Sequence, residues 1–370
     1  MTLRADNRPL ALAAALLLGC AGSSSPPGGA AGTPGIAGAD GRGGSSAATG
    51  GTRGSGGAAA GAGGAAGAAG AAGGVSDAGA PSSDAGAPTG FWDTSNIPAA
   101  KNVLMFKFLN RTNGQYPDSQ VFWSFQNQPH SLADMPLFDM PANSAGRMYF
   151  YLGAPNSKYF DFIEFTIGAR TFNGNTTRVD AFGIKLAMRL HSADGSDLTV
   201  GEDYATFAED RAVTFQKFLN EVPAEFDACA AQMPFRIVEP GAAGFNQGGA
   251  QQHYYESFVD ALWAANGLTI AKPGPNGSGL GAFPDISAAI YRHVGDQPGT
   301  FTPDGKLSNH ALWTDSATFY TAAPADYYAR FWHAHALGGK AYGFPYDDVG
   351  GYSSFISHGD PQYLVIAIGW

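Results

Sequence analysis

Two acidic residues, Glu164 and Asp180, have surroundings that suit acid–base chemistry. Glu164 lies within residues 159–167, a segment rich in phenylalanine and isoleucine. A carboxylate among such groups loses solvation, which favours its protonated form and suits a general acid. Asp180 stands where a polar stretch gives way to apolar residues, and it is the candidate for a second carboxylate. Taken alone, the pair is equally compatible with solvated acids on a strand.

The two carboxylates can cooperate only if their strands pair in a suitable register. We expect strands at 160–167 and 178–190, joined through the turn residues Asn173-Gly174. A strict two-residue turn would place Glu164 and Asp180 on opposite faces of the hairpin. A shift of one residue pairs position 166 with 180, and puts both acids on one face, about 8 Å apart. Inverting glycosidases separate their two carboxyls by roughly 6.5–9.5 Å, so we predict the shifted register.

The elements that position these acids follow from hydrophobic periodicity. Alternating patterns predict strands at 102–109, 121–126, 148–152, 160–167, 178–190, 341–346 and 363–368. Helical spacing predicts helices at 204–222, 251–265 and 325–335, the second ending at Asn266-Gly267. These patterns indicate a mainly β fold. Its body comprises residues 91–200 and 301–370, and a smaller mixed α/β domain is inserted at 201–300.

The N-terminal residues predict export and a lipid anchor. Residues 1–19 combine two arginines with a short apolar run, as in a signal peptide. Leu17-Leu18-Gly19-Cys20 matches a bacterial lipobox, so Cys20 is the expected site of lipid attachment. Ala21 in place of aspartate favours the outer membrane or cell surface over retention at the inner membrane. Ordinary secretion, with a coincidental cysteine, is the alternative.

Residues 20–90 consist almost entirely of small residues and proline, and nothing among them can form a packed core. We expect a disordered Gly/Ala-rich tether, with an end-to-end distance of about 45 to 50 Å.

Charge and cysteine content narrow the possible partners. The formal net charge of −10 argues against nucleic acid and anionic lipid surfaces, so membrane contact is expected only through the Cys20 lipid. Cys229 then has no cysteine to pair with and is expected to be a buried apolar residue. His333 and His335 point to different sides of a helix, so we expect no metal. We also expect no cofactor, and a monomer.

Longer motifs resemble a known family. The string Phe162-Ile163-Glu164-Phe165-Thr166 and residues 175–184 resemble glycoside hydrolase family 64, thaumatin-like β-1,3-glucanases that release laminaripentaose. Residues 119–125 and 343–349 extend this resemblance, which covers about 100–370. It implies a thaumatin-like β-barrel or sandwich body and a mixed α/β domain, flanking a wide acidic groove. It also implies an inverting mechanism without metal.

The resemblance also implies roles for individual residues. On its pattern Glu164 is the general acid and Asp180 the general base, while Thr166, Asp347 and Asp348 contact sugar in the groove. Gly168 and Asn173 stand where more substantial sugar-facing residues are expected, which leaves the product length open.

The sequence therefore predicts an endo-acting, inverting β-1,3-glucanase that acts on laminarin- or curdlan-type glucan. Its products would be short oligosaccharides such as laminaripentaose. The alternatives are a non-catalytic, β-glucan-binding surface lipoprotein of thaumatin-like fold, and a surface-display protein of the same fold.

Overall fold

The computed structural model describes residues 86–142, 145–274 and 280–370. The predicted signal peptide, Cys20 and residues 20–85 of the predicted tether lie outside the described residues. Within the described part, no helix is both long and apolar enough to cross a membrane.

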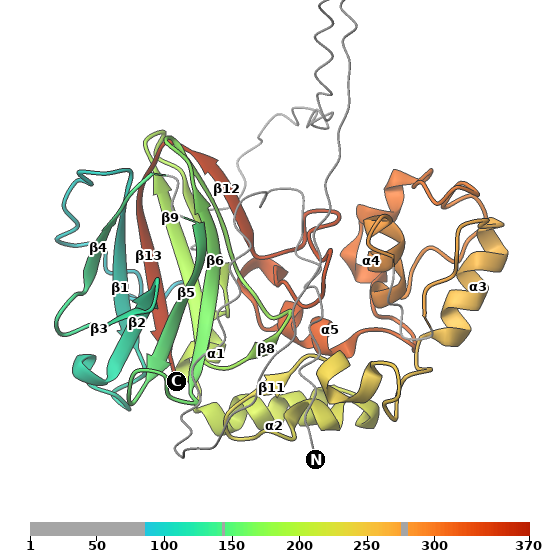
Figure 1. Cartoon of the computed structure of the whole chain (residues 1–370), viewed down its shortest axis with the longest axis horizontal. Coiled ribbons are helices and arrows are strands. Elements are labelled where there is room, and N and C mark those ends of the chain that lie inside the picture. The colour runs from blue at the N-terminus through green and yellow to red at the C-terminus, as the bar shows by residue number, and fades with distance from the viewer. Residues whose placement is uncertain (1–85, 143–144, 275–279) are drawn as a thin grey trace, which may run out of the picture. The chain divides into compact units, whose positions relative to one another are not determined.

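The strands form two main sheets, drawn as two layers in Figure 1. The first sheet has the order β10-β9-β13-β1-β4 and the second β12-β7-β6-β5-β2-β3. Only the β1–β13 pair within them is parallel in the described chain. The strands are β1 (Leu104–Arg111), β2 (Val121–Phe125), β3 (Gln128–Ser131), β4 (Leu137–Met140), β5 (Ala145–Leu152), β6 (Phe160–Ile167), β7 (Thr171–Thr176), β9 (Lys185–Ser192), β10 (Asp197–Gly201), β12 (Phe355–Gly359) and β13 (Pro361–Gly369).

Aromatic side chains from both sheets fill the space between the layers. Phe106 of β1 meets Phe165 of β6 with ring centroids 5.6 Å apart, and Phe108 stacks on Trp123 at 4.9 Å. Alternate residues of each strand face this core, as expected for packed sheets. Among the described residues no ladder joins the two sheets, so the body is a sandwich and not a closed barrel. The predicted mainly β architecture is confirmed.

The helices lie between β10 and β12 in sequence and form a second core. They are α1 (Tyr204–Ala208), α2 (Arg211–Glu221), α3 (Glu256–Asn266), α4 (Pro284–Arg292) and α5 (Tyr327–Ala334). Short 3-10 or π turns occupy Asp118–Gln120, Ala224–Ala230, Gly241–Phe245, His310–Trp313, Ser316–Thr318 and Leu337–Gly339. A small antiparallel pair, β8 (Ala181–Phe182) with β11 (Ile237–Val238), joins this part to the segment that carries Asp180.

The predicted helices are mostly present, with shifted boundaries. The one expected at 204–222 is two helices, because the backbone is extended at Glu209 and Asp210. Helix α3 ends at Gly267 in the left-handed conformation, with φ of 60°, as the Asn266-Gly267 signal predicts. Helix α4 was not predicted. The division of the chain at residues 200 and 300 stays a prediction.

The predicted hairpin register is wrong. Strand β7 begins at Thr171, and the turn lies at residues 168–170, where the Gly168 amide donates to the Thr171 carbonyl. Asn173 and Gly174 are therefore strand residues, and Thr166 pairs with Asn173 and not with residue 180. Gly174 suits this place because a Cβ there would lie 2.9 Å from the Glu164 carbonyl oxygen.

Two of the predicted strands are also corrected. Residues 178–190 are not one strand, because the backbone leaves the second sheet after β7, pairs with β11 at β8 and enters the first sheet as β9. At Gly183 between them, an added Cβ would lie 1.7 Å from the Phe160 carbonyl oxygen, so only glycine fits. Residues 341–346 form turns and not a strand, since their backbone bonds to loops.

Candidate functional site

One guanidinium group brings the two predicted carboxylates together. Arg147 of β5 lies directly across from Glu164 of β6, and its Nε donates to Glu164 Oε1 at 2.8 Å. Its Nη1 lies 3.4 Å from Asp180 Oδ2. Burial would lower the pKa of Arg147, but Glu164 and Asp180 outweigh it and raise that pKa above its ordinary value. The pair thus meets through Arg147 and not through the predicted hairpin.

The site lies on the outer face of the second sheet. Glu164 and Thr166 alternate with Phe165, which points into the sandwich core. The side chains of Glu164 and Asp180 are 20% and 39% exposed, so both can meet a solute. Beside them Thr166 Oγ1 and the Oδ1 of Asn175, the cross-strand neighbour of Glu164, are buried and have no hydrogen-bond partner in the described chain. Polar atoms without partners next to two carboxylates indicate a surface built to receive hydroxyl groups or water.

Arg178 fixes the loop on which Asp180 is carried. Its fully buried guanidinium donates to Asp161 of β6 and to Glu202, which follows β10. The Arg178 amide donates to the Tyr342 carbonyl at 2.7 Å, and its own carbonyl accepts from the Tyr328 hydroxyl at 2.6 Å. Hydrogen bonds of its side chain and its main chain to four partners therefore fix Arg178, which lies two positions before Asp180.

A second buried ion cluster holds the loop at residues 341–349. Asp347 is fully buried and accepts hydrogen bonds from Arg292 of α4 and from the Gly343 amide. His333 of α5 faces Asp347 Oδ2 through Nε2 and the Gly339 carbonyl through Nδ1. Two acceptors require two donors, so His333 is a cation in this arrangement.

The burial of Asp347 corrects its predicted contact with sugar. Its carboxylate has no exposed surface, and its role is to hold the loop in place. Asp348, the next residue, is exposed and accepts from the Tyr342 hydroxyl at 3.3 Å. Burial and the negative charges of Asp348 and Asp347 raise the pKa of Tyr342. Asp348 thus remains a groove candidate.

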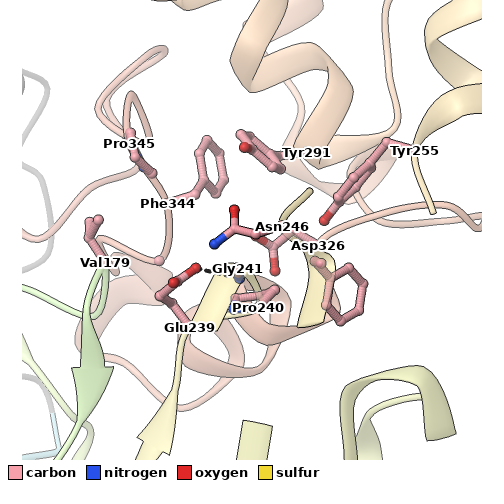
Figure 2. A pocket seen from close by; sticks show the side chains of 12 residues that line it. Val179, Glu239, Pro240, Gly241, Asn246, Tyr255, Tyr291, Asp326, Phe344 and Pro345 are labelled. Atoms are coloured by element: carbon pink, nitrogen blue, oxygen red, sulfur yellow. Dashed lines mark hydrogen bonds between the residues drawn. The ribbon is translucent and has the colours of Figure 1, made fainter. Parts of the chain in front are cut away.

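A partly open pocket of about 80 Å³ lies next to the loop that carries Asp180, and its lining residues are drawn in Figure 2. Val179, next to Asp180, forms part of its wall, and the Glu239 amide donates to the Asp180 carbonyl at 3.2 Å. Asn246 and Asp326 add polar groups to the lining, with aromatic rings around them.

Sequence reasoning missed Arg147, Arg178 and the pocket residues. Arg147 precedes the alternating aromatic run of β5, and a charged residue there signals a partner across the strand. Arg178 lies within the string that carries the family resemblance, but its long-range partners are not visible in sequence. His333 and His335 bind Asp347 and Glu221 separately, and the described residues hold no metal-type cluster of acids, histidines or cysteines.

Comparison with known sequences gives the family of the chain. The family model of glycoside hydrolase family 64, described as β-1,3-glucanase, matches residues 152–282 and 282–368. Glucan endo-1,3-β-glucosidases of Cellulosimicrobium cellulans and Arthrobacter sp. (strain YCWD3) are each 41% identical over 54 residues. These matches cover 15% of this chain and 10% of the length of each relative.

Solved structures give a broader match. A family 64 laminaripentaose-producing β-1,3-glucanase from Paenibacillus barengoltzii is 29% identical, with a TM-score of 0.62, covering 75% of this chain and 77% of that one. The same enzyme complexed with laminarihexaose is 28% identical over the same shares of both chains, with a TM-score of 0.61. A β-1,3-glucanase domain from Clostridium beijerinckii shares the fold at 23% identity, with a TM-score of 0.60, covering 74% of this chain and 100% of that one.

Replacing Arg178 with methionine should destabilise the protein strongly. The change leaves Asp161 and Glu202 buried without their cation, which costs about 3–5 kcal/mol for a buried pair. Urea unfolding measures the loss. Arg170→Met is the matched control, because its ion pair with Asp360 is exposed and its removal should leave the unfolding midpoint essentially unchanged. Equal midpoints for the two variants would contradict the proposed role of Arg178.

The contribution of His333 should depend on pH. Burial lowers its pKa, but Asp347 and the Gly339 carbonyl outweigh burial and raise that pKa above 6.5. A raised folded-state pKa gives stability that is complete below the unfolded-state value and is lost as pH rises through the folded value. Burial would raise the pKa of Asp347, but His333 and Arg292 outweigh burial and lower it. The stability that Asp347 contributes is therefore lost only in acid, below the pH range in which His333 titrates.

The unfolding free energy of wild type should therefore exceed that of His333→Gln by more at pH 6 than at pH 9. Denaturant unfolding at the two pH values measures this difference. His253→Gln is the control, since its pair with Glu256 is exposed. A difference for His333→Gln that is the same at both pH values would refute the assignment.

Proposed function

Because the chain belongs to glycoside hydrolase family 64, the β-1,3-glucanases, we propose that it hydrolyses β-1,3-glucan between Glu164 and Asp180. The observation that carries this assignment is the contact of both carboxylates with one guanidinium, that of Arg147. Hydrolysis of a glycosidic bond needs two carboxyl groups at a set spacing on either side of the bond. Arg147 holds such a spacing on an accessible face.

In this proposal Glu164 is the general acid and Asp180 the general base. The contact with Arg147 uses Glu164 Oε1, which leaves Oε2 to carry a proton to the glycosidic oxygen. It likewise uses Asp180 Oδ2 and leaves Oδ1 to accept a proton from water. The water attacks the anomeric carbon from the opposite face, the bond to the departing sugar breaks, and the product has inverted configuration.

The spacing of the pair is compatible with inversion. The distances from Arg147 Nε to Glu164 Oε1 and from Arg147 Nη1 to Asp180 Oδ2, added to the separation of these two nitrogens, limit the distance between Glu164 Oε1 and Asp180 Oδ2 to about 8.5 Å. Inverting enzymes keep roughly 6.5–9.5 Å between their carboxyls, because a water molecule must fit beside the sugar.

We propose that cleavage occurs within the glucan and not at its end, because both carboxylates are accessible from solvent. Glu164 and Thr166 lie on the outer face of β6, and Asp348 is exposed beside the Tyr342 hydroxyl. We assign both residues to sugar contacts, and Thr166 Oγ1 is a hydroxyl without a partner in the described chain. Short oligosaccharides, such as laminaripentaose, are the expected products.

Glu164→Gln and Asp180→Asn should each lower the release of oligosaccharides from curdlan by about 10²–10⁴-fold with folding intact, because acid–base catalysis contributes this much. Chromatography of the products and circular dichroism of the variants measure both quantities. Asp360→Asn, an exposed carboxylate paired with Arg170, is the control and should keep full activity. Full activity in either site variant would sink the assignment.

Proton NMR of fresh products should show the α anomer at the new reducing end. A non-catalytic glucan-binding protein predicts instead that wild type binds curdlan and releases nothing over long incubation. A surface-display protein predicts neither binding nor release.

We further propose export of the chain and anchoring through a lipid on Cys20, at the outer membrane or cell surface. The lipobox motif supports this proposal. In a bacterial host, wild type should incorporate labelled palmitate and sediment with membranes, whereas Cys20→Ser should do neither. Unlabelled wild type found in the medium would instead indicate ordinary secretion.

A further inference from the structure

The pocket beside Asp180 contains polar groups that the proposed acid–base chemistry does not use. Tyr255 of the segment leading into α3 is 1% exposed, and its hydroxyl has no hydrogen-bond partner in the described chain. Figure 2 shows this hydroxyl pointing toward the middle of the pocket, where Asn246 and Asp326 also lie. A buried hydroxyl without a partner costs free energy, and a ligand that supplies the partner recovers it.

The other polar groups can bind a neutral hydroxyl from several sides. The Asn246 side chain makes no hydrogen bond within the described residues, and it offers both a donor and an acceptor. Burial raises the pKa of Asp326 to about 8, and the charges of Asp347 and Glu239 add to this effect, whereas the hydrogen bond from the Ala329 amide opposes it. A protonated Asp326 donates a hydrogen bond at neutral pH, while its Oδ1 caps helix α5. Glu239 also lines the pocket, but its two carboxylate oxygens accept from the Gly241 and Ala242 amides, so the whole set suits an alcohol better than a cation.

The dimensions of the pocket restrict what can enter. An engineered cavity of about 150 Å³ encloses benzene, so about 80 Å³ is too small for a six-membered sugar ring. A hydroxymethyl group is much smaller and extends further from the ring than any other substituent of a glucosyl residue. Val179, the neighbour of Asp180, and Glu239, whose amide donates to the Asp180 carbonyl, both line this space, so it lies close to the backbone of the proposed general base.

We infer that this pocket is a specificity site which receives the hydroxymethyl group of one glucosyl residue next to the cleaved bond. This inference rests on the proposed function. Tyr255, Asn246 and Asp326 would bind the primary hydroxyl, and Phe344 would pack against its carbon. A glucosyl residue with a branch on that hydroxyl cannot occupy this position, so cleavage is confined to unbranched stretches of glucan.

Tyr255→Phe is the sharpest test, because it removes only the hydroxyl. Since that hydroxyl has no partner in the free protein, its loss should not lower the melting temperature. In a Glu164→Gln background, which binds without turnover, calorimetry should show about three- to tenfold weaker binding of laminarihexaose. Asn246→Leu should weaken binding at least as much.

A second ligand separates the hydroxymethyl group from the rest of the sugar. A β-1,3-linked xylohexaose has the same linkages and lacks this group, so it should bind about three- to tenfold more weakly than laminarihexaose. The Tyr255→Phe change should reduce this difference, because it weakens binding of laminarihexaose and leaves binding of the xylohexaose unchanged. Equal binding of the two oligosaccharides to the parent protein, or an equal loss for both on substitution, would overturn the inference.

Tyr254→Phe provides the matched control. The Tyr254 hydroxyl is also buried without a partner, but it is not part of the pocket lining, so affinity for laminarihexaose should not change. The two proposals fail in different ways. If wild type releases no product from curdlan, the proposed hydrolysis fails; if it releases product and Tyr255→Phe binds laminarihexaose as its parent does, only the pocket assignment fails.

Discussion

The buried guanidinium of Arg178 is the constraint on which the candidate site depends. It joins Asp161 of one sheet to Glu202 at the end of a strand of the other, and its backbone is bonded to Tyr342 and Tyr328. Removing three charges from water is costly, and only complete pairing offsets that cost. Any displacement of the loop would leave a charge unpaired in the core. The position of Asp180, two residues along the chain, is therefore determined by packing and not by the turn of a hairpin.

The same kinds of side chain have different roles in the core and at its surface. The clusters around Arg178 and Asp347 are buried, and every charge in them has a partner, so they are suited to holding loops in place. Arg147 repeats the pattern at the surface, where Glu164 and Asp180 keep one oxygen each outside its contacts. A carboxylate with a fixed position and a spare oxygen is what general acid–base catalysis requires. The buried clusters thus supply rigidity, and the exposed one is arranged for the proposed acid–base chemistry.

Local patterns predicted β1, β2, β5, β6 and β13, because alternation such as that over residues 160–167 reflects which face is buried. They missed the strands β3, β4, β7, β10 and β12. They failed at Asn173-Gly174, which has the composition of a turn but lies in a strand, since the turn three residues earlier already closes the hairpin. The two predicted carboxylates do come together, through Arg147 and not through the predicted register. The partners of Arg147 and the burial of Asp347 depend on contacts between segments far apart in sequence, and no local pattern encodes them.

Unsatisfied polar atoms mark function only when a second feature accompanies them. Tyr254 has a buried hydroxyl without a partner, as do Tyr255 and Thr166, and each such group costs about 1–3 kcal/mol. The Tyr254 hydroxyl lines neither the carboxylate site nor the pocket, so nothing there recovers the cost. Thr166 instead lies two residues from Glu164 on the same face of β6, and Tyr255 faces a pocket whose lining includes Val179, the neighbour of Asp180. A polyol substrate carries hydroxyl groups at both places, so binding would restore the hydrogen bonds that folding left unmade.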